Sequence, residues 1–280
     1  MLFGGIVTVS LLTAVISCFR SGIGLHWLWV APLSFGGSFL GWTILAALVL
    51  LVSGLVVDME KTRDHDSRYY RALLELYIPF VMKIARARIR TKGLEQMPEA
   101  KRILLVCNHL HEADPVILLH FFRKYQLAFV GKRETKKMFL IGPLMYKIMC
   151  QFVNRENDRE ALRTILDCIS LLKEDEVSIG VFPEGYINED RKLHHFRSGV
   201  FKIATKTQVP IVVCTITNTN HLVGNLLRLK PTDIDLHLVR TIYPEEYAGM
   251  STVEIGNMIY ALMAEDLGPE NVLPYPEENT

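Results

Sequence analysis

Charge is almost absent from the first part of this sequence. Arg20 is the single Lys, Arg, Asp or Glu before Asp58. Residues 2–19 and 35–57 contain no charged side chain at all. At about 1.5 Å per residue, each run can cross a hydrocarbon core of about 30 Å, the first only just. The absence of charged side chains excludes an ordinary water-exposed surface for residues 1–57. It predicts two hydrophobic helices that anchor the chain in a membrane.

Between the two apolar runs, residues 20–34 contain Trp27, Trp29 and Pro32, which is typical of an interfacial connection. A cleaved signal peptide is the competing interpretation, but residues 1–5 contain no basic side chain and no small-x-small site follows. A lipoprotein-type site at residues 15–18 lacks the same basic start. Two full spans and a hairpin that dips into one leaflet fit the sequence equally well.

Cysteine is scarce, and the net charge of +1 gives no argument for nucleic-acid binding. The five cysteines are odd in number and form no C-x-x-C pair, which excludes a disulfide framework and a cysteine zinc site. We expect them to be small buried side chains in a reducing compartment. Between residues 58 and 93, nine basic residues outnumber five acidic ones. This excess suits anionic headgroups and predicts a cell-membrane protein whose remainder lies on the cytoplasmic side.

From residue 58 onward, strand-like and helical patterns alternate. Apolar runs predict strands at 102–107, 127–130, 177–182, 210–217 and 233–243. Helical spacing predicts helices at 66–90, 115–123, 136–149, 158–172, 198–206 and 252–267. The alternation predicts an α/β fold with a mostly parallel sheet flanked by helices. The predicted division is a membrane anchor (1–57), an amphipathic basic helix or linker (58–92), a globular domain (93–267) and a loose tail (268–280).

A histidine and an aspartate follow the first predicted strand of the domain, in the run N-H-L-H-E-A-D-P at residues 108–115. Their spacing in a strand-to-helix turn suits a general base, His109, and a carboxylate that orients it, Asp114. An aspartate before a proline is equally typical of a helix N-cap, with the histidine an ordinary loop residue. His111 and Glu112 add a metal option, but no third ligand stands at a suitable spacing, so we expect no metal.

A second block, F-P-E-G, ends a later predicted strand with Glu184 and Gly185. The glycine lets backbone amides approach an oxyanion or a phosphate, and the glutamate can hold a basic residue or a substrate hydroxyl. Between the two blocks, Lys132, Arg133 and Arg155 are candidates for a phosphate contact. Taken singly, each pattern is equally typical of a turn or of solvated charge.

Taken together and in this order, the blocks resemble the 1-acylglycerol-3-phosphate acyltransferase (lysophosphatidate acyltransferase) family of glycerolipid acyltransferases. That family shows N-H-x-x-x-x-D, then a basic residue before a Gly-Pro or Pro-Phe-Phe-Gly stretch ending in arginine, then F-P-E-G and a Val-Pro-Ile strand. The matching blocks here are residues 108–114, 132–155, 182–185 and 209–212, and residues 196–204 match as well. Because four blocks agree in order, the resemblance favours the catalytic interpretation of His109.

The resemblance implies an O-acyltransferase of phospholipid biosynthesis, with 93–267 as its acyltransferase domain. It implies transfer of a fatty acyl group from acyl-CoA or acyl-carrier protein to the hydroxyl of a lysophospholipid. The acceptor would be 1-acylglycerol-3-phosphate, which would become phosphatidate. His109 would deprotonate the hydroxyl and Asp114 would orient His109, without a covalent acyl-enzyme, cofactor or metal. The implied partners are these two substrates and the bilayer, and the implied substrate-binding residues are Asn108, Lys132, Arg133, Arg155, Glu184 and Gly185.

Two departures from the family pattern concern the acceptor. The family usually continues F-P-E-G with Thr-Arg-Ser, whose arginine helps to bind phosphate, whereas Tyr186-Ile187-Asn188 follow here. The phosphate contact then falls to Lys132, Arg133, Arg191 or Lys192, or the acceptor is not lysophosphatidate. A serine often stands two residues after the catalytic histidine, where this chain has His111.

Two alternatives stay open. The first is acyl transfer to another lyso-lipid or an aminolipid, which the Tyr186-Ile187 pair favours. The second is a non-catalytic, membrane-associated lipid-binding protein, against which the intact His109 and Asp114 pair argues.

Overall fold

The computed structural model describes residues 2–61, 63, 65–154 and 157–273. Within these residues, a seven-stranded sheet runs in the order β1-β7-β6-β2-β5-β3-β4. Neighbouring strands are parallel except β6 and β7, which are antiparallel. The prediction of a mostly parallel sheet is therefore confirmed. The strands are β1 (Ala87–Lys92), β2 (Leu104–Cys107), β3 (Leu127–Lys132), β4 (Gln151–Val153), β5 (Ser178–Val181), β6 (Ile211–Thr217) and β7 (Thr232–Ile242).

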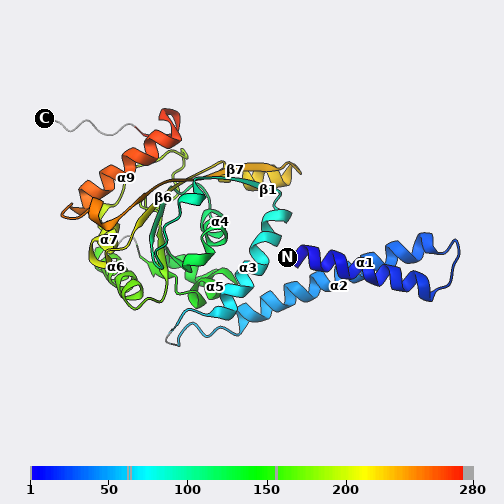
Figure 1. Ribbon diagram of the computed structural model, residues 1–280. Coiled ribbons are helices and arrows are strands. Elements are labelled where there is room, and N and C mark those ends of the chain that lie inside the picture. The colour runs from blue at the N-terminus through cyan, green and yellow to red at the C-terminus, as the bar shows by residue number, and fades with distance from the viewer. Residues whose placement is uncertain (1, 62, 64, 155–156, 274–280) are drawn as a thin grey trace.

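Helices cover both faces of the sheet (Figure 1). Helices α3, α4 and α5 lie on one face and α6, α7 and α9 on the other, while α1 and α2 project as an antiparallel hairpin. The α-helices are α1 (Leu2–Arg20), α2 (Trp27–Leu55), α3 (Arg68–Ile84), α4 (Asp114–Phe121), α5 (Ile141–Lys147), α6 (Asp158–Lys173), α7 (Lys202–Thr207), α8 (Leu222–Leu227) and α9 (Thr252–Leu267). The 3-10 helices are η1 (Leu94–Gln96), η2 (Arg123–Tyr125), η3 (Arg133–Lys137), η4 (Ser198–Phe201), η5 (Thr219–His221), η6 (Pro244–Glu246) and η7 (Pro269–Asn271).

The order of the central strands determines where the two sequence blocks meet. β2, β5 and β6 are continuous runs of buried residues, as expected for strands covered on both faces. β2 pairs in parallel with β5 through Val106 and Val181, and with β6 through Cys107 and Cys214. The carboxyl ends of β2 and β5 therefore lie side by side. Ligands of open α/β sheets bind at that edge.

The segment predicted as one helix over residues 66–90, inside the predicted linker 58–92, is two elements. Helix α3 ends at Ile84, Arg86 takes a left-handed φ of 53°, and β1 begins at Ala87. β1 joins the sheet in parallel with β7. The physical reason is that the period of the apolar positions changes from about 3.6 to 2 at Ala87, so the basic residues alternate along an edge strand.

Three further expectations differ from the structure. Helix α2 begins at Trp27, so half of the predicted connection is helical. The start of the predicted loose tail is docked, because Val272 bridges Leu193 and the Tyr260 hydroxyl donates to the Leu273 carbonyl at 2.7 Å. Residues 274–280 lie outside the described residues. The short elements β4 and α8 were not predicted, and the division at residues 57, 92 and 267 stays a prediction.

The α1–α2 hairpin has the length and composition of a membrane-associated element. Residues 2–21 and 27–55 form two helices long and apolar enough to cross a membrane. Along α1, the residues at every fourth position from Ile6, namely Ser10, Ala14 and Cys18, are buried. These small side chains allow α1 and α2 to approach closely, which is how helices pack in lipid. The apolar side chains on the outer surfaces of both helices remain exposed.

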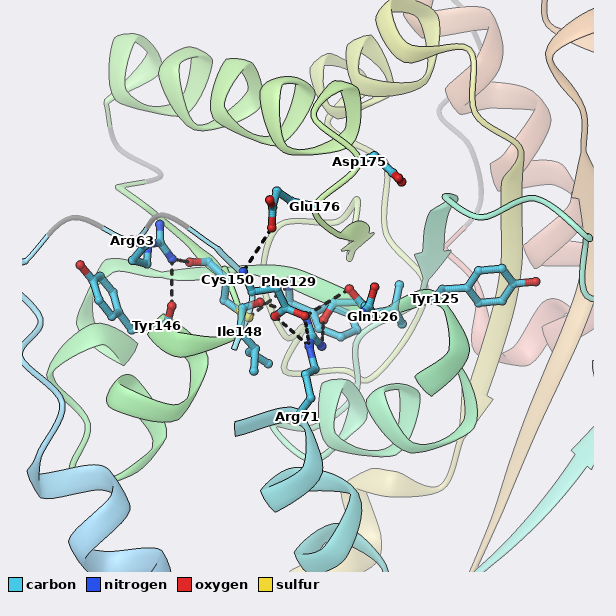
Figure 2. Close-up of polar contacts among 12 residues, drawn as sticks. Arg63, Arg71, Tyr125, Gln126, Phe129, Tyr146, Ile148, Cys150, Asp175 and Glu176 are labelled. Atoms are coloured by element: carbon cyan, nitrogen blue, oxygen red, sulfur yellow. Dashed lines mark hydrogen bonds and ion pairs between the residues drawn. The ribbon is translucent and has the colours of Figure 1, made fainter. Parts of the chain in front are cut away.

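Arg63 ties the segment after α2 to the domain (Figure 2). Its Nη1 donates to the Cys150 carbonyl at 2.5 Å, and its Nη2 donates to Gln151 Oε1 at 3.2 Å. The guanidinium also lies 4.7 Å from the centroid of the Tyr146 ring, a cation–π contact. Burial lowers the pKa of this guanidinium, and the polar and aromatic contacts offset part of its desolvation.

Arg71 ties α3 to the domain in the same region (Figure 2). It forms an ion pair with Asp66 at 2.9 Å and donates to the backbone carbonyls of Gln126, Leu127 and Ile148. Both members of the pair are largely buried, and a buried pair of this kind is strongly destabilised by loss of one partner. Because the carbonyls belong to the ends of η2, β3 and α5, Arg71 fixes α3 against the part of the domain that encloses the cavity described below.

Candidate active site

The loop between β2 and α4, residues 108–114, holds His109 through one buried carboxylate. Asp114 is fully buried, and its Oδ2 accepts hydrogen bonds from His109 Nδ1 at 2.9 Å, Leu110 N at 2.7 Å and His111 N at 2.8 Å. A carboxylate can only accept, so Nδ1 carries the imidazole proton and Nε2 is left as the basic atom. The structure thus brings the two predicted catalytic residues together in the geometry of a base and its orienting carboxylate.

The alternative interpretation of Asp114 as a helix N-cap is wrong. Asp114 is the first residue of α4, and Ala113 occupies the N-cap position without a side-chain cap. The Asp114 carboxylate turns back onto the amides of the preceding loop instead of forward into the first turn of the helix. Its hydrogen bonds therefore order the loop that carries His109.

A second buried carboxylate, Glu184, holds the same loop from the neighbouring strand. Its Oε1 accepts from the His109 backbone amide at 3.0 Å, and its Oε2 accepts from the His194 amide at 3.1 Å and from the Asn188 side chain. Burial raises the pKa of the Glu184 carboxyl to about 7, although the amides of His194 and His109 act in the opposite direction. The prediction that Glu184 contacts substrate is not matched by this placement, because its oxygens face backbone and Asn188.

Two aromatic rings support the His109 imidazole. The Phe182 ring stacks on it with centroids 4.0 Å apart and planes 15° apart, and the Phe129 ring stacks behind Phe182 at 5.5 Å. Phe129 fits there because residue 180 is glycine, where a Cβ would lie 2.4 Å from the Phe129 ring. The first residue of F-P-E-G, to which the sequence assigned no role, therefore fixes the plane of the base.

Gly185 forms a tight turn directly after β5. Its φ is 85°, a conformation that a glycine adopts without strain, and its amide donates to the Phe182 carbonyl at 3.0 Å. A Cβ at this position would lie 3.1 Å from the Arg197 side chain. The turn uses the Gly185 N–H, and the predicted approach of backbone amides here to an oxyanion or a phosphate stays a prediction.

A cavity of about 730 Å³ opens beside His109. This volume falls within the range of about 300–1,000 Å³ that is typical of small-molecule sites. His109 and Phe182 line one part of it, and Lys132, Glu112 and Glu134 bring polar groups to it. The remaining lining is mostly apolar and comes from α3, α4, β3 and α5, with Tyr186 and Ile187 after F-P-E-G: Leu74, Pro115, Val116, Leu119, Phe129, Val130, Met138, Ile141, Leu144, Met145 and Ile148.

The predicted basic residues are placed unequally around this cavity. Lys132 lines it and lies 3.5 Å from Glu134, whereas Arg133 lies 3.6 Å from Glu160 on α6 and does not line it. Arg155 falls outside the described residues. Arg191, an alternative candidate from the sequence, donates from Nη1 to the Leu110 carbonyl at 2.7 Å and so touches the loop that carries His109.

Asn108 and Cys107 belong to the sheet. The Asn108 side chain donates to the Ile216 carbonyl at 2.9 Å and accepts from the Ile216 amide at 2.8 Å, which extends the pairing of β2 and β6. Both ends of the buried Asn108 amide contact Ile216, and its predicted substrate contact stays a prediction. Burial raises the pKa of the Cys107 thiol well above its usual range, so this sulfur is no thiolate nucleophile. All five cysteines are free and buried, as predicted.

Other groups near the loop were not found from the sequence. The Asn188 side chain and the His194 amide also donate to Glu184. The sequence does not reveal these contacts, because they depend on how the chain turns between residues 186 and 194. His111, where a serine is frequent, accepts from the Ala113 amide at 3.1 Å through Nδ1. Among the residues that the structure describes, three or more His, Cys, Asp or Glu side chains nowhere gather as a metal site.

Comparisons with known proteins match this arrangement of sheet and loop. A family model described as Acyltransferase matches residues 88–217, from β1 to the end of β6. A probable 1-acyl-sn-glycerol-3-phosphate acyltransferase of Mycoplasma pneumoniae is 30% identical over 204 residues, which cover 69% of this chain and 76% of that protein. The chain belongs to the 1-acyl-sn-glycerol-3-phosphate acyltransferase family. It is thus a member of a family of O-acyltransferases, and the resemblance found in the sequence is confirmed.

Further members of the acyltransferase family share the same region. A 1-acyl-sn-glycerol-3-phosphate acyltransferase of Borreliella burgdorferi is 25% identical over 167 residues, 59% of this chain and 66% of that protein, just under two thirds of its length. The crystal structure of the 1-acyl-sn-glycerophosphate acyltransferase PlsC from Thermotoga maritima has a TM-score of 0.62 at 24% identity. That likeness covers 80% of this chain and 87% of the other, and it shows a shared fold.

Removal of the base should stop acyl transfer without unfolding the chain. We expect His109→Ala to lower kcat by about 10²–10⁴-fold, the usual contribution of a general base. Asp114→Asn should also lower kcat severely, because the imidazole loses the carboxylate that fixes its tautomer. Turnover of the purified full chain in detergent and its thermal midpoint measure the two effects separately. His221→Ala, an exposed histidine on η5, is the matched control. Near-normal activity of His109→Ala would remove His109 from the reaction.

Glu184 should make stability depend on pH. Its pKa is about 7 in the folded chain, against an ordinary value of 4.5, so between these two pH values only the folded chain keeps the proton. The free energy of unfolding should therefore fall as pH rises from about 4.5 to 7, by up to about 3 kcal/mol, and change no further above that. Denaturant titrations of the full chain against Glu184→Gln measure this slope. Parallel pH profiles for the two proteins would show that Glu184 does not titrate in this window.

Proposed function

We propose that this chain transfers a fatty acyl group from a thioester donor, acyl-CoA or acyl-carrier protein, to the free hydroxyl of a lysophospholipid. The proposed acceptor is 1-acylglycerol-3-phosphate and the product is phosphatidate. The observation that carries the proposal is the His109 Nδ1 to Asp114 Oδ2 hydrogen bond of 2.9 Å beside a large apolar cavity. The names of the Mycoplasma and Borreliella relatives support the choice of acceptor.

The proposed reaction is a direct transfer with His109 as general base. Nε2 takes the proton of the acceptor hydroxyl while its oxygen attacks the thioester carbonyl carbon. The C–S bond then breaks, and the departing thiolate takes the proton back from the imidazolium. Asp114 stabilises the imidazolium while it exists. A covalent acyl-enzyme is not needed, and we propose that no metal and no cofactor take part.

The cavity gives the acyl chain of the donor a place beside the base. Its lining is mostly apolar, so transfer of an acyl chain from water into it is favourable. His109 lies at the same surface, so a chain inside the cavity brings its carbonyl end toward Nε2. The apolar walls also keep water from the thioester, which favours transfer over hydrolysis.

Arg191 is our candidate for the acceptor phosphate, in place of the arginine that usually follows F-P-E-G. Ile187 and Tyr186 line the apolar cavity, so this part of the turn offers no cation. Arg191 has a φ of 59° in the next turn, where its amide donates to the Asn188 carbonyl, and this left-handed conformation is strained for an arginine. Its guanidinium reaches the Leu110 carbonyl next to His109, and its fork of donors suits a phosphate.

The hairpin and the basic residues after it supply the proposed location. We propose that α1 and α2 hold the chain in the cell membrane and that the catalytic domain lies on the cytoplasmic side, because the basic excess follows the second apolar run. A lipid acceptor then reaches His109 from the bilayer. A second candidate function, transfer to a different lyso-lipid or an aminolipid, is favoured by Tyr186 and Ile187 in the cavity lining.

A panel of acceptors tests the proposed function. Purified full chain with labelled acyl-CoA and, separately, labelled acyl-carrier protein is given 1-acylglycerol-3-phosphate, its phosphate-free analogue and lysophospholipids with larger headgroups. We expect the phosphate monoester to give the highest kcat/KM. A preference for a phosphate-free acceptor would replace the proposed substrate by the second candidate, and acylation of none would leave a lipid-binding protein.

Loss of Arg191 should weaken binding of a phosphorylated acceptor. We expect Arg191→Gln to raise KM for 1-acylglycerol-3-phosphate by about tenfold or more, since a charge-assisted hydrogen bond contributes about 1.5–3 kcal/mol. The KM of a phosphate-free acceptor should not change. Arg191→Lys should restore part of the loss, and Arg163→Gln on the exposed surface of α6 is the matched control for charge. Equal KM values for Arg191→Gln and Arg163→Gln would exclude Arg191 from the phosphate contact.

A further inference from the structure

The end of α8 and the turn after it present two leucines to solvent, and one of them has a backbone conformation that disfavours leucine. Leu227 is 81% exposed and Leu229 is 73% exposed. Leu229 also has a φ of 55°, the left-handed region in which a residue with a branched side chain is strained. Glycine or asparagine would relieve the strain and reduce the exposed apolar surface. Folding of the domain therefore gives no reason for a leucine at this position.

These leucines lie near the end of α3, the helix that packs against α1 of the hairpin. The Thr232 amide, just after the turn, donates to the Arg86 carbonyl at 3.1 Å, which places the turn against the end of α3. Val81 and Ile84 on the last turns of α3 are also about half exposed. Farther along, the Phe80 ring lies 6.2 Å from the Phe3 ring of α1. We call the side chains of Val81, Ile84, Val223, Leu227 and Leu229 the α8 patch.

The position of the α8 patch in the molecule agrees with these contacts. In Figure 1, α8 is the gold coil next to the start of β7, beside the β1 label, on the side of the domain from which the hairpin projects. Helix α6 lies on the opposite side of the domain. A bilayer that receives the hairpin would therefore meet the α8 patch and not α6.

Basic side chains border the α8 patch. Arg228 and Lys230 flank Leu229 in the sequence, and Arg86 lies beside the turn; all three are exposed. The acidic Asp233 is near, but it lies opposite Arg88 in the β1–β7 register. Apolar tips bordered by Lys and Arg suit the boundary between acyl chains and anionic headgroups, where long basic side chains reach the phosphates.

We propose that the α8 patch is a second membrane contact, which enters the headgroup and acyl boundary of the same bilayer that holds α1 and α2. The hairpin alone leaves the domain free to tilt about one attachment. A second contact beyond α3 fixes its tilt, so the cavity keeps a constant orientation toward the lipid that supplies the acceptor. The inference rests on the hairpin lying in a bilayer, which is part of the proposed function.

Depth-dependent quenching tests the contact in the full chain. Leu229→Cys, Leu166→Cys on α6 and Leu12→Cys on α1 are each labelled with an environment-sensitive fluorophore and reconstituted in vesicles of phosphatidylcholine and phosphatidylglycerol. The native cysteines are buried, and the wild-type chain taken through the same labelling is the blank. We expect labels at 12 and 229 to emit to the blue and to be quenched by lipid-borne nitroxide. The label at 166 should be quenched by iodide.

The possible results separate the α8 contact from the membrane location of the hairpin. A label at 229 that behaves like the label at 166, while the label at 12 is quenched from the lipid, overturns the α8 contact and leaves the hairpin in place. A label at 12 that iodide reaches overturns the membrane location in the proposed function.

A pair of double variants gives a functional readout. Leu227→Asp with Leu229→Asp should raise KM for an acceptor presented in vesicles by about tenfold, because the charged side chains replace the apolar surface that enters the acyl boundary. Activity on a short-chain acceptor dissolved below its micelle concentration should stay at the wild-type level. Leu162→Asp with Leu166→Asp, two exposed leucines of α6, is the matched control. Equal KM values for the two double variants would contradict the proposal.

Discussion

Two buried carboxylates determine the shape of the loop that carries His109. Asp114 accepts two backbone amides and the imidazole from the start of α4, and Glu184 accepts the His109 amide from the end of the neighbouring strand. A loop that moved away from either would leave a buried acceptor without a partner, which costs several times more than one exposed hydrogen bond contributes. Because Glu184 follows β5 and His109 follows β2, this constraint holds only where these strands are neighbours. The order of the strands therefore determines where His109 lies.

The two sides of the imidazole meet different surroundings. Nδ1 faces a carboxylate that stays in place, while Phe182 and Phe129 hold the ring plane by stacking. The cavity beside the imidazole is mostly apolar, with Glu112, Lys132 and Glu134 as its charged lining residues. Arg71 extends this order outward, since it joins α3 to the ends of β3 and α5 that bound the cavity. The contacts of Arg71 therefore connect α3, which follows the hairpin, to the residues that bound the cavity beside His109.

The sequence predicted the sheet class, the pairing of His109 with Asp114 and the two hydrophobic helices, because each depends on short-range pattern and composition. The sequence did not reveal hydrogen-bond partners that lie far along the chain. Asn108 is taken by the Ile216 backbone, and the Glu184 oxygens are taken by amides, which no local spacing reveals. The β1 strand was missed because a helical pattern runs directly into it, and the change of period at Ala87 is short. Gly185 has a left-handed φ of 85°, and its predicted role in binding the substrate stays a prediction.

This chain lacks the arginine that usually follows F-P-E-G, and Arg191 is the residue that we propose in its place. Tyr186 and Ile187 line the mostly apolar cavity, so neither position supplies a cation there. Arg191 lies four residues after Ile187 and has a strained left-handed φ. Its guanidinium donates a hydrogen bond to the Leu110 carbonyl, next to His109. Strain of this kind persists only when surrounding contacts hold the residue in place, and here Leu193 bridges Val272 just beyond the turn. Residues 271–273 thus hold the backbone at Leu193, two residues after Arg191.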